Sequence, residues 1–135
     1  MCSKYKVGDC YSFSKTISEY DIYTYAGLSG DFNPMHINLE YAKKSKFKKR
    51  IAHGMLVTGL ISATLGMYMP GPGTIYLEQN LHFVSPVYFN DTITAKVKII
   101  EILNNKVAKI ETSCFNQNGI EVINGIATVL LPISK

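Results

Sequence analysis

Asp31 and His36 are the two ionisable side chains of one short segment, residues 30–36, which reads Gly-Asp-Phe-Asn-Pro-Met-His. A carboxylate and an imidazole five residues apart reach a common water molecule if the turn between them folds back. Such a pair can take a proton from that water and deliver one to a neighbouring atom. The spacing by itself leaves two structural alternatives open: an aspartate that caps the turn and a histidine that fills a surface niche.

A second chemically useful feature lies at His53-Gly54-Met55, where a long apolar stretch begins. The N–H groups in the first turn of a helix lack internal partners and carry partial positive charge. Glycine lets a ligand oxygen approach such an N–H without meeting a Cβ atom. Gly54 could therefore help to form an oxyanion hole for a carbonyl that gains negative charge. The structural alternative is that Gly54 permits close packing and that His53 caps the helix.

The first half of the chain, residues 1–70, is predicted to be mainly helical, and its helices position the residues named above. Ser18-Glu19-Tyr20-Asp21 resembles a capping box and predicts a helix through about Leu28, with Gly30 as its stop. Asn33-Pro34 predicts a turn, because the residue before proline disfavours helix. A short helix is expected over Leu39–Lys46.

The long helix predicted over Gly54–Met69 is apolar all round, which is typical of a helix enclosed on every side. Small residues recur along it every four positions, at Gly54, Thr58, Ser62 and Gly66. This spacing lets another backbone or a narrow ligand come close, and tight packing against a sheet explains it equally well.

The second half of the chain has the period of strands. Thr92–Leu103 alternates polar and apolar residues and is followed by a turn at Asn104-Asn105. Hairpins imply antiparallel pairing. We therefore predict an α+β fold in one domain, residues 1–135, with an antiparallel sheet wrapped around a central helix. The expected strands are Thr74–Phe83, Thr92–Leu103, Lys106–Phe115 and Glu121–Leu131.

Composition narrows the class of protein. The 135 residues are 47% hydrophobic and 18% charged, which is typical of a globular protein and argues against disorder. The low charged fraction suggests that a second copy of the chain covers part of the surface. The net charge of +4 comes from a run of cations within residues 43–50, with no nucleic-acid-binding motif. We expect either a solvated face or a site that attracts a phosphorylated ligand.

The three cysteines, Cys2, Cys10 and Cys114, fit neither a disulfide framework nor a zinc site. Free thiols indicate a reducing compartment, so we expect a cytoplasmic protein in which Cys10 and Cys114 are buried. Residues 1–11 lack the apolar region of a secretory signal. The long uncharged stretch is interrupted at residues 70–73, which favours a buried helix over a membrane span.

Residues 25–36 resemble the hydratase 2 motif of MaoC-like dehydratases, whose core Gly-Asp-x-Asn-Pro-x-His is complete in this chain. Ile-Ala-His-Gly-Met-Leu at residues 51–56 matches the family at the usual distance downstream. Residues 73–77 and 81–87 resemble its strands, so the likeness covers roughly residues 5–133. Within the family, the chain is most similar to short (R)-specific enoyl-CoA hydratases.

This resemblance implies a hotdog fold, a homodimer or higher oligomer, and no metal or organic cofactor. It implies reversible addition of water to a trans-2-enoyl-CoA, giving an (R)-3-hydroxyacyl-CoA. Asp31 and His36 match the family's catalytic pair, and which of them is base and which is acid stays open. Gly54 matches the donor to the thioester carbonyl. Ser62 and Met55 are expected to line the substrate site, with Asn33 holding the loop beside it.

Three alternatives share the fold. A 3-hydroxyacyl-acyl-carrier-protein dehydratase would use the same residues in the reverse direction. A non-catalytic subunit that binds acyl thioesters would not need the pair Asp31 and His36. A thioesterase would need a water placed for attack on the carbonyl, whereas the motif matches hydratases. The lysine run could meet the phosphates of either thioester carrier.

Overall fold

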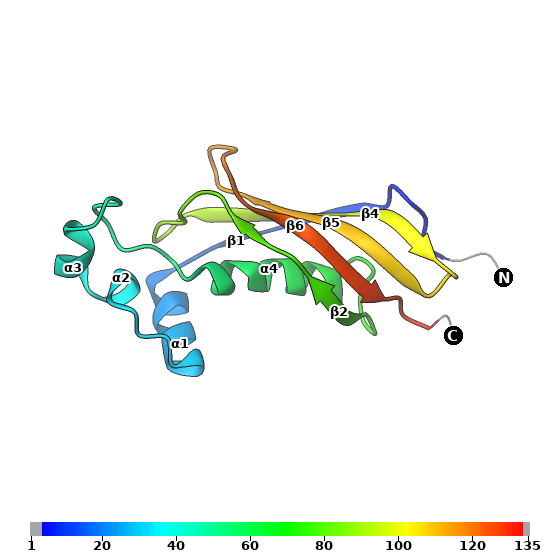
Figure 1. Cartoon of the computed structure of the whole chain (residues 1–135), viewed down its shortest axis with the longest axis horizontal. Helices are drawn as coiled ribbons and strands as arrows, with labels where there is room; N and C mark the ends of the chain where they lie inside the picture. Colours follow the sequence, from blue (N-terminus) through cyan, green and yellow to red (C-terminus); the bar gives the residue numbers. More distant parts are fainter. Residues whose placement is uncertain (1–3, 134–135) are drawn as a thin grey trace.

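An antiparallel sheet and one long helix dominate the computed structural model, which describes residues 4–133 (Figure 1). The sheet has the strand order β1-β4-β5-β6-β2, and β3 also pairs with β6. Helix α4 (Gly54–Met67) lies along one face of this sheet. The strands are β1 (Cys10–Thr16), β2 (Ile75–Gln79), β3 (His82–Phe83), β4 (Thr92–Leu103), β5 (Val107–Phe115) and β6 (Glu121–Leu130).

The alternation seen in the first part of β4 is reproduced in the structure, because every second side chain from Ile93 to Ile99 is buried. Ile93, Ala95, Val97 and Ile99 enter the core that the sheet shares with α4. The turn from β4 to β5 contains Asn104 and Asn105 with φ angles of 52° and 55°, a left-handed conformation that asparagine tolerates well. The predicted hairpin is therefore confirmed.

Helix α4 is covered on one side, so the prediction of a helix enclosed on every side is wrong for the isolated chain. Val57, Ile61 and Leu65 are at most 1% exposed where they face the sheet. On the other side Met55 and Met67 are 56% and 64% exposed. A single sheet can cover only one face of a helix, and the sequence did not show that the opposite face has no cover within this chain.

Strand β1 was not predicted, because the first half of the sequence looked mainly helical. It pairs with β4 at the edge of the sheet, in a register that sets Phe13 opposite Ala95. Most of its side chains are exposed, and only Tyr11 and Phe13 alternate with polar residues, which is too short a pattern to identify a half-buried strand. The edge position also makes Cys10 exposed, which contradicts the expected buried thiol, whereas Cys114 is buried as expected. Cys2 lies outside the described residues.

The strand expected over Thr74–Phe83 is divided into β2 and β3 by a close approach to β6. The Asn80 N–H donates to the Ile126 carbonyl oxygen, and the Asn80 side chain accepts from the Ile126 N–H. A Cβ atom on Gly125 would lie 1.9 Å from the Asn80 carbonyl oxygen, so only glycine fits there.

The shorter helices lie together at one end of the sheet, beyond the N-terminus of α4 (Figure 1). Helix α1 (Glu19–Ser29) has the predicted capping box at Ser18 and ends at Gly30, whose φ is 79°. Asn33 is not helical, as expected, but Pro34 begins a short helix, α2 (Pro34–Ile37), which proline can start because the first position of a helix needs no N–H donor. Helix α3 (Leu39–Lys43) ends before the predicted Lys46. No helix within residues 4–133 is long and apolar enough to span a membrane.

Candidate active site

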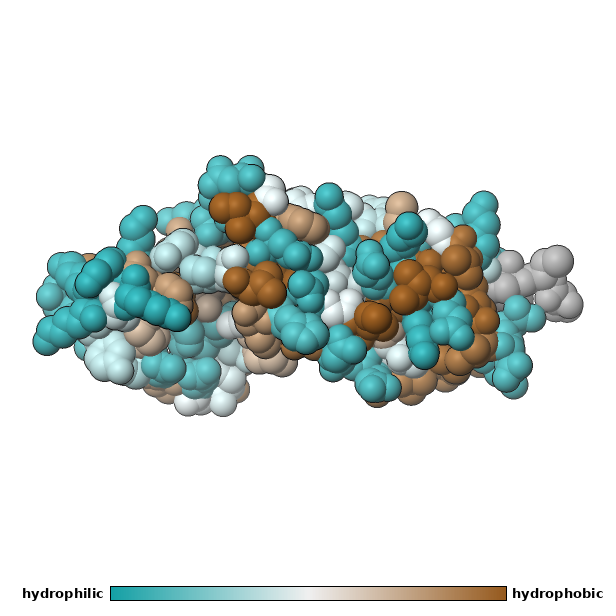
Figure 2. Space-filling view, turned by 45° about the horizontal axis from the view of Figure 1, so that its top comes forward, coloured by the Kyte–Doolittle hydropathy of each residue, from teal (hydrophilic) through white to brown (hydrophobic). Residues whose placement is uncertain are grey.

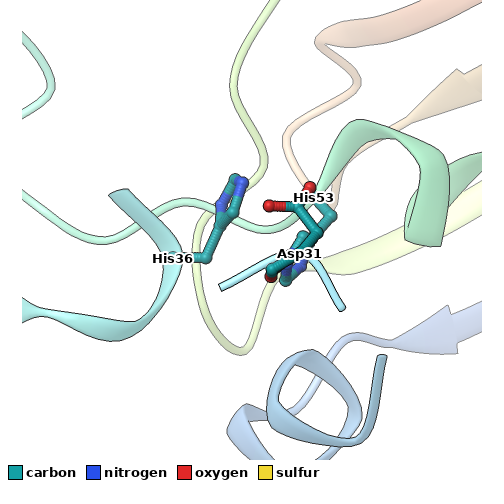
Figure 3. A group of neighbouring side chains, drawn as sticks. All are labelled: Asp31, His36 and His53. Atoms are coloured by element: carbon teal, nitrogen blue, oxygen red, sulfur yellow. The ribbon is translucent and has the colours of Figure 1, made fainter. Parts of the chain in front are cut away.

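Three side chains from three different segments meet beside the N-terminus of α4 (Figure 3). Asp31 follows α1, His36 lies in α2, and His53 precedes the first residue of α4. One donor or acceptor atom of each side chain lies within 4.8 Å of those of the other two. The segment between Asp31 and His36 therefore folds back, as their joint action on one water would require.

Local hydrogen bonds fix the loop that carries Asp31. The Asp31 side chain accepts from the Asn33 N–H at 3.2 Å, and the Asn33 side chain accepts from the Met35 N–H at 3.1 Å. Asn33 is thus the N-cap of α2, which agrees with its expected role in holding the loop. The Asp31 residue itself is exposed, so its carboxylate remains accessible to a ligand.

His36 has a defined tautomer, because one ring nitrogen contacts a main-chain carbonyl. Its Nδ1 lies 2.6 Å from the Ile51 carbonyl oxygen, and a carbonyl can only accept, so Nδ1 carries the proton. The lone pair of the neutral ring is then on Nε2. Burial lowers the pKa of His36 below its usual 6.5, and the neighbouring His53 lowers it further, against opposing effects of the Ile51 carbonyl and Asp31. Near pH 7 the ring is therefore a neutral acceptor.

His53 belongs to the same cluster, although sequence reasoning treated it as a possible helix cap. Its side chain makes no capping bond. Instead, its Nε2–H donates to the Asp31 carbonyl oxygen at 2.9 Å, and its ring centroid lies 3.8 Å from that of His36. His53 is 2% exposed, and its Nδ1 has no hydrogen-bond partner among the described residues. Its position directly before Gly54 was the one sequence signal that pointed to it.

The N-terminus of α4 offers free donors next to this cluster. Because His53 does not cap the helix, the N–H groups of Gly54, Met55 and Leu56 have no partner within residues 4–133. A Cβ atom on Gly54 would lie 2.6 Å from Cε1 of Phe83, so a larger residue would displace that ring. Gly54 therefore combines an unpaired N–H with the absence of a Cβ atom, and the Phe83 ring packs against its Cα.

Two clefts meet beside Gly54, and Met55 contributes to both. The first has a volume of about 490 Å³ and contains His36, Gly54 and Phe83 in its wall. The second, of about 450 Å³, runs along the exposed side of α4 past Thr58 and Ser62. The structure thus brings Met55 and Ser62 to the cleft region, with Ser62 on the far side of Met55 from His36.

Two imidazoles and one carboxylate also form a set of ligands that metal ions use. In this cluster the rings of His36 and His53 are tilted against each other, with 31° between their planes and 3.8 Å between their centroids. Each ring has one nitrogen on a main-chain carbonyl, which leaves Nε2 of His36 and Nδ1 of His53 as the two free nitrogens.

Comparison with known proteins identifies the family of this chain. The sequence model of the MaoC-like domain family matches residues 6–120 of this chain. An (R)-specific enoyl-CoA hydratase of Rhodospirillum rubrum is 50% identical over 128 residues, which are 94% of this chain and 88% of that protein. A mitochondrial 3-hydroxyacyl-[acyl-carrier-protein] dehydratase of Arabidopsis thaliana is 41% identical, over 94% of this chain and 78% of that protein.

A solved structure gives the same result for the fold. The (R)-hydratase of Aeromonas caviae involved in PHA biosynthesis superposes with a TM-score of 0.93 and 37% identity, over 97% of this chain and all of that one. The chain belongs to the MaoC-like family. The α4 helix against an antiparallel sheet is the hotdog fold that the resemblance implied.

Proposed function

We propose that this protein is a hydro-lyase, an (R)-specific enoyl-CoA hydratase, which adds water reversibly to trans-2-enoyl-CoA. The observation that carries the proposal is the joint position of Asp31, His36 and the free N–H of Gly54 at one end of α4. The relatives named as (R)-specific enoyl-CoA hydratases support the substrate and the direction of addition.

Asp31 and Nε2 of His36 are the acceptors for the attacking water. One carboxylate oxygen of Asp31 and one ring nitrogen of His36 lie within 4.8 Å, so one water can reach both side chains with hydrogen bonds of about 2.8 Å. The water oxygen forms a bond to C3 of the enoyl group while one acceptor takes a proton. The C2–C3 double bond becomes single, and a proton from the pair completes the addition at C2.

Negative charge collects on the thioester oxygen between these two events. The Gly54 N–H is the donor for that oxygen, because it has no other partner among the described residues and no Cβ atom stands before it. This role needs no metal and no organic cofactor. The acyl chain lies in the cleft that Met55 and Ser62 line, where the side chains come from the exposed side of α4.

A homodimer is part of the proposal. Strand β2 ends the sheet order and leaves one of its edges unpaired among the described strands. Its side chains Ile75 and Leu77 are 54% and 55% exposed, and Met55 and Met67 are exposed on the neighbouring helix. Figure 2 shows apolar side chains gathered toward the end of the molecule where the described chain begins and ends. A second copy would cover these groups by extending the sheet and packing against α4. The free thiols of Cys10 and Cys114 support the proposal that the protein is located in the cytoplasm, a reducing compartment.

The test is the loss of absorbance of the conjugated enoyl thioester when the purified protein is mixed with crotonyl-CoA. We expect turnover without added cofactor, an (R)-product identified by a stereospecific dehydrogenase, and loss of turnover in Asp31→Asn. Release of free CoA without hydration would indicate a thioesterase and overturn the proposal. Inactivity on every enoyl-CoA would also overturn the proposal. The protein would then be a carrier-protein dehydratase if the carrier-protein thioester reacts, and a binding subunit if that thioester does not react.

A further inference from the structure

The first cleft has a cation in its wall. Lys46 and Phe47 line it, together with His36 and Gly54 at the reaction centre, and no acidic side chain contributes to it. The Lys46 ammonium lies 5.1 Å from the centre of the Phe47 ring, which favours a position over the ring. The cleft therefore connects the place expected for the thioester with a positively charged group.

Lys46 stands among other cations that have no anionic partner. In the run of residues 43–50, Lys43 pairs with Glu40 at 2.9 Å and Arg50 pairs with Glu19 at 3.1 Å. Lys44, Lys46, Lys48 and Lys49 form no ion pair within residues 4–133. Their positive potential is therefore not cancelled locally, and an anion is attracted to this end of the molecule.

The second cleft has the opposite character. It contains no lysine or arginine, and its one charged side chain is Glu78. The two clefts separate at Met55, next to Gly54. A thioester bound at Gly54 also has two arms, an apolar acyl chain and a pantetheine arm that ends in a phosphate. The charges of the two clefts therefore distinguish the two arms.

We infer that the first cleft receives the pantetheine arm and that Lys46 binds its phosphate. This inference rests on the proposed function, because it assumes a thioester whose carbonyl lies at Gly54. The same phosphate is present in acyl-CoA and in an acyl-carrier protein, so the site serves the chemistry that both sources share. An ammonium–phosphate pair is a charge-assisted contact, and its loss is expected to raise KM ~5-fold to 10-fold.

The experiment compares two substrates that differ in the phosphate. Wild type, Lys46→Met and the control Lys98→Met are each assayed with crotonyl-CoA and with crotonyl-pantetheine, which lacks the phosphate. Lys98 is exposed on β4, forms no ion pair among the described residues and lines neither cleft, so its loss removes the same charge elsewhere. Methionine keeps the apolar part of the lysine side chain against Phe47.

We expect Lys46→Met to raise KM for crotonyl-CoA and to leave KM for crotonyl-pantetheine unchanged, with both constants normal in Lys98→Met. Added salt should weaken crotonyl-CoA binding less in Lys46→Met than in wild type. If Lys46→Met changes KM equally for the two substrates, or for neither, the assignment of Lys46 is overturned. Hydration by wild type would in that case still support the proposed function. If wild type hydrates neither substrate, the proposed function itself fails. A parallel assay with the carrier-protein thioester shows which source the site prefers.

Discussion

Replacing His53 by phenylalanine is expected to lower activity without lowering stability. Phenylalanine keeps an aromatic ring against Tyr25 and His36, whose ring centroids lie 4.8 Å and 3.8 Å from that of His53. It removes the Nε2–H that donates to the Asp31 carbonyl oxygen at 2.9 Å. The loop that carries the Asp31 carboxylate then loses the bond that ties it to α4.

The two effects on stability oppose each other. Losing the hydrogen bond to the exposed Asp31 residue costs about 1 kcal/mol, because water can replace the donor. Removing the buried Nδ1, which has no partner among the described residues, recovers about 1–3 kcal/mol of desolvation cost. The free energy of unfolding should therefore stay within ~1 kcal/mol of wild type or rise slightly. Activity has no such compensation, and a displaced Asp31 should reduce kcat/KM ~10-fold to 100-fold.

The pH profile of kcat/KM gives a second measurement. If His53 had only a structural role, its replacement would leave this profile unchanged. His53 is one of the groups that lower the pKa of His36, so its removal should raise that pKa. Neutral His36 is the acceptor, and activity is lost as the pH falls through its pKa. The acidic limb of kcat/KM should therefore move to higher pH in His53→Phe. His82→Phe, at an exposed histidine of β3, is the matched control and should change neither measurement. Wild-type kcat/KM together with an unchanged acidic limb in His53→Phe would refute the reasoning.

Further predictions use the same contacts. Gly125→Ala should lower the free energy of unfolding by about 3 kcal/mol, since the added Cβ atom meets the Asn80 carbonyl oxygen at 1.9 Å. Gly27→Ala, in α1 with open space around it, should raise the free energy of unfolding by ~1 kcal/mol. Chemical denaturation measures both changes, and equal effects would contradict the packing argument. Gly54→Ala should displace the Phe83 ring and reduce kcat/KM ~10-fold or more, and the double variant with Phe83→Leu should recover part of the loss in the hydration assay. Prolonged dialysis against EDTA should leave the hydration rate unchanged, and a loss that zinc or another divalent ion restores would show a metal in the mechanism.

Local sequence signals predicted the parts of the site that depend on neighbours along the chain. The capping box at Ser18 and the stop at Gly30 bring α1 to its end just before Asp31. Asn33 then caps α2, which sets His36 one turn further on. These bonds join residues at most a few positions apart, so the motif of residues 30–36 contains nearly all of the geometry that pairs Asp31 with His36.

The alternation of polar and apolar residues likewise predicted the central strands. It failed at β1, since Phe13 is the one residue of this edge strand that packs against the core. It also failed at the break between β2 and β3. There the main chain of Asn80 meets Gly125 of a strand that is distant in the sequence.

Tertiary structure alone decided the remaining features of the site. His53 contacts Asp31 across 22 positions, and Ile51 fixes the tautomer of His36 across 15. Lys46 enters the wall of a cleft that begins at Gly54, although α3 separates it in the sequence from Asp31 and His36. The sequence shows the types of these residues, but their distances from one another depend on how α1, α2 and α4 pack at one end of the sheet. Sequence therefore determined which groups could react, and folding determined which nitrogen accepts, which N–H stays free and where each cleft leads.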